Sequence, residues 1–211
     1  MICEKNGINF QDLHFDLLQE IANIGSGSAV TSLSQLVNKK IDMNIPKLQV
    51  LEFDQVSEAI GGAENPVCAI LVNISSPNIN GIMMFLIEHK HSMSLVSMLL
   101  KDIEWISNEF GMMEQSAITE IGNILTSSYL IALSSLLGEK IGSSIPYLSI
   151  DMAGAILSVP AIEFGKVADK AFFIETIFRG GDPTIDISGY FMLVPDLDSF
   201  RFIFDKFGMP V

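Results

Sequence analysis

Two pairs of side chains in this sequence have types and spacing suited to chemistry. Glu20 and Asn23 lie three residues apart, and Glu120 and Asn123 repeat that spacing one hundred residues later. Residues three or four apart share one face of an α-helix, so each pair would present a carboxylate beside an amide. The carboxylate can pair with a cation, whereas the amide has no useful basicity but can hydrogen-bond and orient water.

Helical periodicity predicts the elements that carry these pairs. We expect long helices from about Phe10 to Val37 and from about Ser107 to Leu137. One face of the first helix would hold Asp16, Glu20 and Asn23, and the matching face of the second would hold Ser116, Glu120 and Asn123. The opposite faces are apolar, through Leu18, Ile21, Ala22, Gly25 and Ala29 in the first helix and Ile118, Ile121, Gly122, Leu125 and Tyr129 in the second. The polar faces are therefore predicted to point to solvent or to a partner, and the apolar faces into the core.

A single Glu–Asn pair on a helix would mean little, because solvent faces commonly carry both residues. Asn is, however, unfavourable in the middle of a helix, and here it occurs there twice. Neighbouring surface positions differ between the two helices, whereas the Glu, the Asn and a proline downstream do not. That proline, Pro46 or Pro146, follows its Asn at the same distance, and its predicted role is geometric, because it fixes φ.

The whole chain reads as a duplication. Residues 20–50 and 120–150 align without gaps and share 13 of 31 positions, where about two would be expected by chance. We predict one domain, 1–211, built of two homologous halves at about 10–105 and 107–211. Each half continues with alternating strands, a hairpin and a short closing helix, which predicts an α+β fold around a mainly antiparallel sheet. Residues 54–65 are expected to be a loop, residues 180–184 a turn, and residues 153–170 are not assigned.

Composition limits the possible partners and location. The net charge of −13 and the 49% apolar content argue against nucleic acid or an anionic membrane as the main partner. The two cysteines, Cys3 and Cys68, make a disulfide framework improbable, which favours a reducing cytoplasm. The segments 65–87 and 121–138 read as two strands and an amphipathic helix rather than as membrane spans. No metal site is predicted, and the internal duplication favours a monomer.

At its two motifs the sequence resembles the CheC family of bacterial chemotaxis phosphatases. The family pattern is Asp or Ser, three residues, Glu, two residues, Asn, twenty-two residues, Pro. The first copy matches through Asp16, Glu20, Asn23 and Pro46, and the second through Ser116, Glu120, Asn123 and Pro146. The resemblance extends over essentially the whole chain. CheX and FliY share the motif, but CheX is typically shorter, and FliY carries an additional switch domain for which this sequence has no room.

The resemblance implies hydrolysis of the aspartyl phosphate of the response regulator CheY, which would supply its own Mg²⁺ and lysine. Asn23 and Asn123 would orient the attacking water, much as a glutamine does in GTPases. Glu20 and Glu120 would pair with the lysine of the regulator, and Asp16 and Ser116 would contact it further along the helix.

The family also binds the receptor deamidase CheD, and the resemblance implies that this chain would do so through the segment from about Asp151 to Ile156. The alternative is a non-catalytic adaptor that binds phosphorylated CheY and sequesters CheD. The amide in both motifs favours the enzyme, because docking alone would not require it.

Overall fold

The computed structural model describes residues 12–38, 40–44, 46–99, 110–164, 170–179 and 186–208. Its elements are α1 (Asp12–Val37), β1 (Asp42–Met43), β2 (Lys47–Glu52), α2 (Phe53–Ala59), β3 (Pro66–Ser75), β4 (Asn80–Glu88), α3 (His89–Leu99), α4 (Met112–Leu137), β5 (Gly142–Ser143), β6 (Tyr147–Met152), α5 (Ala153–Phe164), β7 (Lys170–Arg179), β8 (Asp186–Pro195) and α6 (Leu197–Asp205). The predicted α+β class with a mainly antiparallel sheet is confirmed. The order of elements in the first half recurs in the second.

All described strands join one sheet, in the order β1-β7-β8-β4-β3-β5, with β2 also on β7 and β6 also on β3. Every pairing is antiparallel. Each half therefore sends its first two strands to the other half. β1 and β2 pair with β7, and β5 and β6 pair with β3. The two halves cannot fold around separate sheets, because each supplies an edge of the other's.

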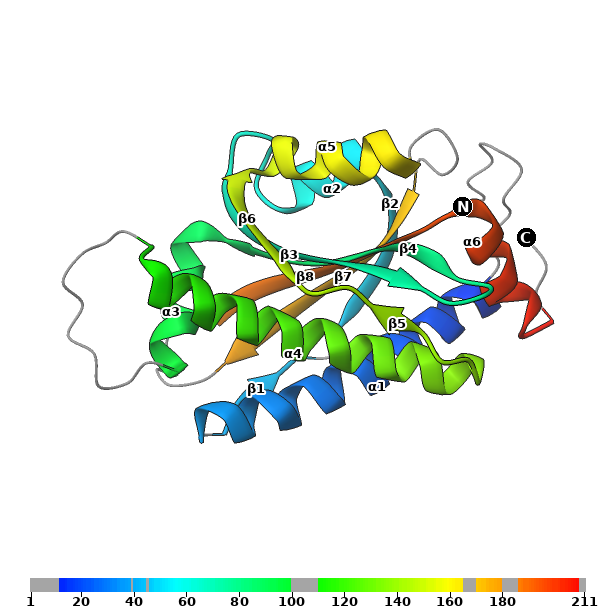
Figure 1. Ribbon diagram of the computed structural model, residues 1–211, viewed down its shortest axis with the longest axis horizontal. Helices are drawn as coiled ribbons and strands as arrows, with labels where there is room; N and C mark the ends of the chain where they lie inside the picture. Colours follow the sequence, from blue (N-terminus) through cyan, green and yellow to red (C-terminus); the bar gives the residue numbers. More distant parts are fainter. Residues whose placement is uncertain are drawn as a thin grey trace.

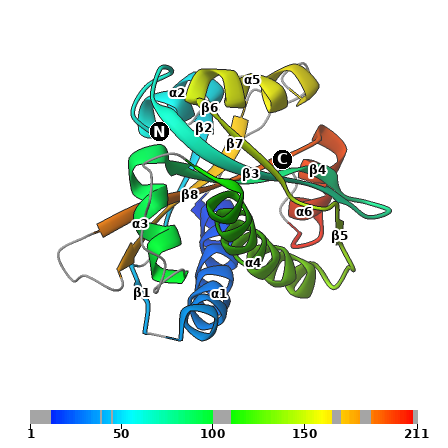
Figure 2. The same cartoon turned by 60° about the vertical axis from the view of Figure 1, so that its left-hand side comes forward.

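Helices cover both faces of this sheet (Figures 1 and 2), giving three layers. α1, α3, α4 and α6 pack on one face, where β4 contributes Met83, Phe85 and Ile87. α2 and α5 pack on the other, against the alternate β4 residues Ile82, Met84 and Leu86. Two apolar clusters result, one on each side of the sheet.

The two long helices end at their predicted positions, Val37 and Leu137. Residues 10–11 and 107–109, included in the predicted helices, lie outside the described residues. α4 begins later than expected, at Met112, because Gly111 is extended and serves as the N-cap. At its other end Gly138 adopts a left-handed conformation with φ of 62°, which ends a helix without strain in a residue that lacks Cβ.

Two segments differ from the expectation. Residues 54–59, predicted as a loop, belong to α2, whose start is stabilised by a reciprocal capping box between Glu52 and Gln55. Helix α2 buries Val56 against the sheet, so tertiary packing outweighs the weak local pattern of a seven-residue helix. The unassigned segment forms α5 through Phe164 and contains Pro160. Residues 165–169, and the predicted turn at 180–184, lie outside the described residues.

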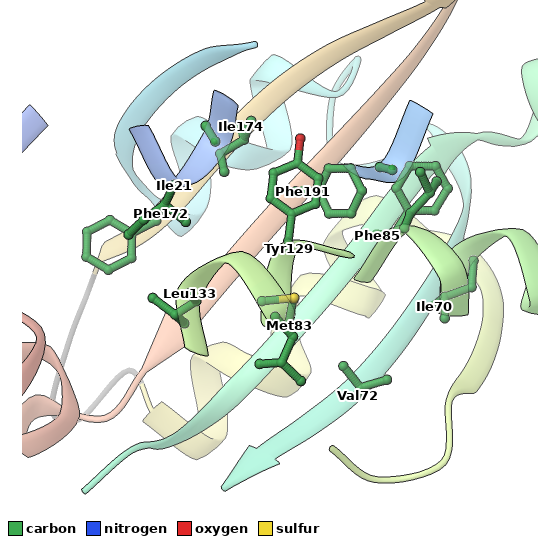
Figure 3. Packing of buried hydrophobic residues seen from close by; sticks show 14 of the residues in the cluster. Ile21, Ile70, Val72, Met83, Phe85, Tyr129, Leu133, Phe172, Ile174 and Phe191 are labelled. Carbon is green, nitrogen blue, oxygen red and sulfur yellow. The ribbon is translucent and has the colours of Figure 1, made fainter. Parts of the chain in front are cut away.

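α1 and α4 pack against each other and against the sheet through Tyr129 of α4. The Tyr129 ring packs against Phe191 of β8, with centroids 4.1 Å apart and the planes tilted by 35° (Figure 3). Its hydroxyl lies 3.4 Å from the hydroxyl of Thr176. Burial raises the pKa of Tyr129 to about 12, partly offset by Thr176. Gly25 of α1 lies directly over this ring, since a Cβ there would come within 2.5 Å of it. The glycine thus permits the close approach of the two helices.

α4 is long and apolar enough to span a membrane by length and composition alone, but 56% of its most apolar window is buried in the protein. A core helix has the same properties, and α4 is packed against β3, β4 and α1. The prediction that residues 121–138 form a helix with one buried side is confirmed, because Ile121, Leu125 and Tyr129 are buried whereas Ile131 is exposed.

Candidate functional site

The first polar face, Asp16, Glu20 and Asn23, is exposed along α1. The opposite face of α1 is buried in the apolar cluster between the sheet and helices α1, α3, α4 and α6, as predicted for Leu18, Ile21, Ala22 and Ala29. Helical geometry thus directs the acid and the amide outward while the other face anchors α1. Glu20 forms no ion pair with any described residue. Its carboxylate is free to meet a cation from outside.

A hydrogen-bonded bridge ties this face to the strand region behind it. Gln19 Nε2 donates to Asn23 Oδ1 at 3.2 Å and to the Pro46 carbonyl oxygen at 2.9 Å. Pro46 itself is buried, so it gives Gln19 a fixed anchor. Asn23 and Pro46 also line an open groove between α1 and β1, together with Ser26, Gly27, Val30, Ile41, Asp42 and Asn44.

The second polar face, Ser116, Glu120 and Asn123, lies on α4. Ser116 and Glu120 are exposed and Asn123 is half-buried. Ser116 donates its hydroxyl to the Met112 carbonyl at 2.8 Å, which occupies its proton within its own helix. Pro146 is half-buried just before β6. The face therefore has the same residue types as the first, in a more enclosed setting for the amide.

Each face carries a carboxylate and an amide about one helical turn apart. The described residues contain no group of three or more His, Cys, Asp or Glu arranged to hold a metal ion. A carboxylate and a carboxamide one helical turn apart can bind a cation and hold a water molecule, respectively. Acid–base catalysis by the amide is excluded by its chemistry.

Asp151 lies away from both polar faces. It is exposed on the edge strand β6, and its Oδ1 accepts a hydrogen bond from the Met152 amide at 2.7 Å. Around it, β6 and the helix that follows expose large apolar side chains: Tyr147, Ile150, Met152, Val159 and Ile162. We call these five residues the β6–α5 apolar group. The exposure of these side chains could not be predicted from the sequence, because burial on an edge strand depends on which elements cover it.

Gln19 is the site residue that sequence reasoning missed. It lies between the polar and apolar faces of α1, where a glutamine is consistent with the helical pattern and attracts no attention. Its position four residues before Asn23 is the spacing at which a Gln and an Asn can hydrogen-bond on a helix. That spacing was the available signal, but the second partner, the Pro46 carbonyl, becomes visible only in the folded chain.

Solved structures place this fold among flagellar-switch and chemotaxis proteins. FliY of Thermotoga maritima superposes with a TM-score of 0.70 at 20% identity, covering 94% of this chain and 98% of that one. The middle domain of FliM from Vibrio alginolyticus gives 0.62 at 15% identity, covering 88% and 98%. At these identities the likeness defines the class of fold alone.

Sequence comparison defines the family. The model of the CheC-like family matches residues 13–49 and 113–146, which include both Glu–Asn pairs and both prolines. The chain is 32% identical to the CheY-P phosphatase CheC of Bacillus subtilis over 96% of its length and 97% of that protein. It is 26% identical to the flagellar motor switch phosphatase FliY of the same organism, over 67% of this chain and 37% of FliY. The chain belongs to the CheC-like family.

Proposed function

We propose that this chain is a phosphatase that hydrolyses the aspartyl phosphate of CheY in bacterial chemotaxis. The observation that carries the proposal is the pairing of an exposed Glu20 with an exposed Asn23, and of an exposed Glu120 with a half-buried Asn123, on two packed helices. The family model covers both segments. Its Bacillus subtilis relatives named as phosphatases, CheC and FliY, agree with this activity.

Glu20 and Glu120 act in docking. Each would pair with the active-site lysine of the regulator and so set the register of the helix against it. A solvent-facing carboxylate is a weak base near neutral pH, which makes it unsuited to proton abstraction. Asp16 and Ser116 would extend the same contact toward the start of each helix.

Asn23 and Asn123 act on water. The aspartyl phosphate is an activated acyl phosphate, and the regulator supplies Mg²⁺ and a lysine that neutralise charge on its oxygens. What it lacks is a water molecule in line with the phosphorus. Attack by that water forms one P–O bond and breaks the bond between phosphorus and the aspartate oxygen, so the aspartate leaves as a carboxylate and both protons of the water remain with the phosphate. Positioning of this kind is worth on the order of 10²-fold in rate, or about 2.7 kcal/mol.

The test is the decay of phosphorylated CheY in the presence of substoichiometric protein. The parent chain should accelerate the decay with turnover, and Asn23→Ala combined with Asn123→Ala should abolish the acceleration while CheY binding survives. The control is Gln35→Ala with Ser135→Ala, exposed matching positions on the same two helices, which should retain parental turnover. A parent chain that leaves the decay unchanged refutes the enzyme, and a fully active Asn double variant refutes the assigned role of the amides.

The carboxylates need a different readout. Glu20→Lys with Glu120→Lys should raise KM for phosphorylated CheY by at least tenfold, because each new cation faces the regulator's lysine. A titration of CheY binding should show the same loss. An unchanged KM would contradict the docking role.

A second candidate, binding of the deamidase CheD, rests on the surface around Asp151. A non-catalytic adaptor would use both this surface and the two polar faces. Large exposed apolar side chains favour protein contact, and Tyr147 and Ile162 are 68% and 75% exposed. Asp151→Lys should weaken CheD binding and leave CheY dephosphorylation intact, whereas Asp198→Lys, an exposed acid on α6, should affect neither. Equal CheD binding by Asp151→Lys and the parent would remove this candidate.

A further inference from the structure

The orientation of the Asn23 side chain is determined by its neighbour. The Pro46 carbonyl oxygen can only accept a hydrogen bond, so the end of the Gln19 side chain that faces it must be the amide nitrogen. The same Nε2 lies 3.2 Å from Asn23. The atom of Asn23 that faces a donor must be its oxygen, so the Asn23 amide is fixed with Oδ1 toward Gln19.

We propose that Gln19 is a positioning residue for Asn23 and that the first polar face depends on it for turnover. This inference rests on the proposed function. With one lone pair of Oδ1 engaged, the second lone pair and the Nδ2 protons point in fixed directions. A water molecule bound by this amide is then held in one orientation, whereas an amide free to flip would exchange donor and acceptor at the same place.

The bridge connects Asn23 to the proline of the first motif. Gln19 spans from α1 to the chain just before β2 and uses its two protons on two different carbonyl oxygens. Pro46 is buried and its ring restricts φ, which limits the movement of the backbone that carries this carbonyl. Because Gln19 is hydrogen-bonded to this carbonyl, its own side chain is held in place, and it in turn restricts the Asn23 amide.

The second polar face lacks this device. Thr119 occupies the position that matches Gln19, and its hydroxyl donates to the Gln115 carbonyl of its own helix at 2.6 Å. A threonine is also too short to reach from α4 to the strand. Asn123 is instead half-buried. The two faces therefore restrict their amides by different means, and only the first should respond to substitution at position 19.

The experiment isolates each face in the full-length chain. In the Asn123→Ala background, where the first face acts alone, we compare Gln19 with Gln19→Met, which keeps the length but has no donor. We expect kcat for phosphorylated CheY to fall about three- to tenfold, with KM changed less than twofold, as befits loss of one ordering hydrogen bond. In the Asn23→Ala background the same Gln19→Met substitution should leave kcat unchanged.

Rescue distinguishes positioning from packing. Gln19→Lys retains donors that can reach both carbonyl oxygens and should recover most of kcat, whereas Gln19→Glu offers only acceptors and should match or exceed the loss in Gln19→Met. The proposal is overturned if Gln19→Met has the same kcat as Gln19 in the Asn123→Ala background, or if only KM changes there. It is also overturned if Gln19→Met lowers kcat equally in the Asn23→Ala background, where only the second face is present.

A second readout needs no turnover. The side-chain amide of Asn23 should show a high NMR order parameter in the parent that falls in Gln19→Met, while that of Asn123 stays unchanged. An Asn23 amide equally mobile in both proteins overturns the proposal whatever the rates. An inactive parent refutes the phosphatase itself, whereas an active parent matched by an equally active Gln19→Met refutes only the role of Gln19.

Discussion

Gly25→Ala tests how closely the two site helices must approach. The added Cβ would lie 2.5 Å from Cδ1 and 2.8 Å from Cγ of Tyr129, whereas carbon atoms in contact prefer about 3.5–4.0 Å. The ring cannot move aside easily, because Phe191 packs against it with centroids 4.1 Å apart and only 2% of Tyr129 is exposed. Helix α1 must therefore move by about 1 Å or the ring must leave its rotamer.

The expected cost follows from two opposing effects. Overpacking of a tight interior costs about 1–3 kcal/mol, and the locked ring places this site in the upper part of that range. Alanine favours the helix over glycine by about 1 kcal/mol. The net loss in the free energy of unfolding is then about 1–2 kcal/mol, which lowers Tm by about 3–6 °C for a chain of this size.

Gly27→Ala is the matched control, two residues along the same helix. A Cβ at Gly27 meets nothing within 4 Å, so only the helix-propensity gain remains. We expect Gly27→Ala to raise stability by about 1 kcal/mol and Gly25→Ala to lower it, both measured by urea and thermal unfolding. If Gly25→Ala is as stable as Gly27→Ala, the close contact at Tyr129 does not limit the approach of the helices.

Two further predictions concern pH. Hydrogen bonds from Ser76 and Asn78 lower the pKa of Glu139 below its ordinary 4.5, so its contribution to stability is present above pH 4.5 and is lost as pH falls through the lower folded value. The gap in urea midpoint between the parent and Glu139→Gln should be constant near neutral pH and vanish in acid, and an equal gap at pH 7 and pH 3 would contradict this. Burial raises the pKa of Tyr129 to about 12 against an ordinary 10.0, with Thr176 opposing the shift, so unfolding releases a proton above pH 10 and stability falls as pH rises. Tyr129→Phe should show a shallower alkaline loss in the same assay, and parallel curves would exclude Tyr129 as its cause.

The faces of the two long helices could be predicted from the sequence because burial of a long amphipathic helix follows its period. The residues predicted to be buried, such as Leu18 and Ile118, are buried, and Glu20 and Glu120 are exposed. Each prediction used a long stretch of regular pattern, so single residues that depart from the helical period did not obscure it. No such stretch exists for α2, which has seven residues and is stabilised by the sheet beneath it.

The exchange of edge strands between halves could not be predicted by this route. Pairing of Lys47–Glu52 with β7 and of Tyr147–Met152 with β3 joins segments more than seventy residues apart, and no local period encodes it. A duplicated sequence is equally consistent with two separate half-sheets. The exchange is favoured because it produces one continuous sheet that is buried on both faces. Two separate half-sheets would have additional unpaired edges.

The same limit applies to the site, and it explains why Gln19 was missed while Asn23 was found. A motif that recurs in one chain reveals what the two halves share, so it indicated the Glu, the Asn and the proline. Gln19 corresponds to Thr119 in the second copy, so a comparison of what the copies share could not indicate it. In the folded chain its Nε2 donates to the carbonyl oxygen of Pro46 at 2.9 Å and to Oδ1 of Asn23 at 3.2 Å, so it connects two residues of the shared motif. In our proposal, position 19, at which the two copies differ, is where the first copy supports its own amide. Thr119 bonds only within its own helix, so substitution of Gln19 should affect the first site and leave the second unchanged.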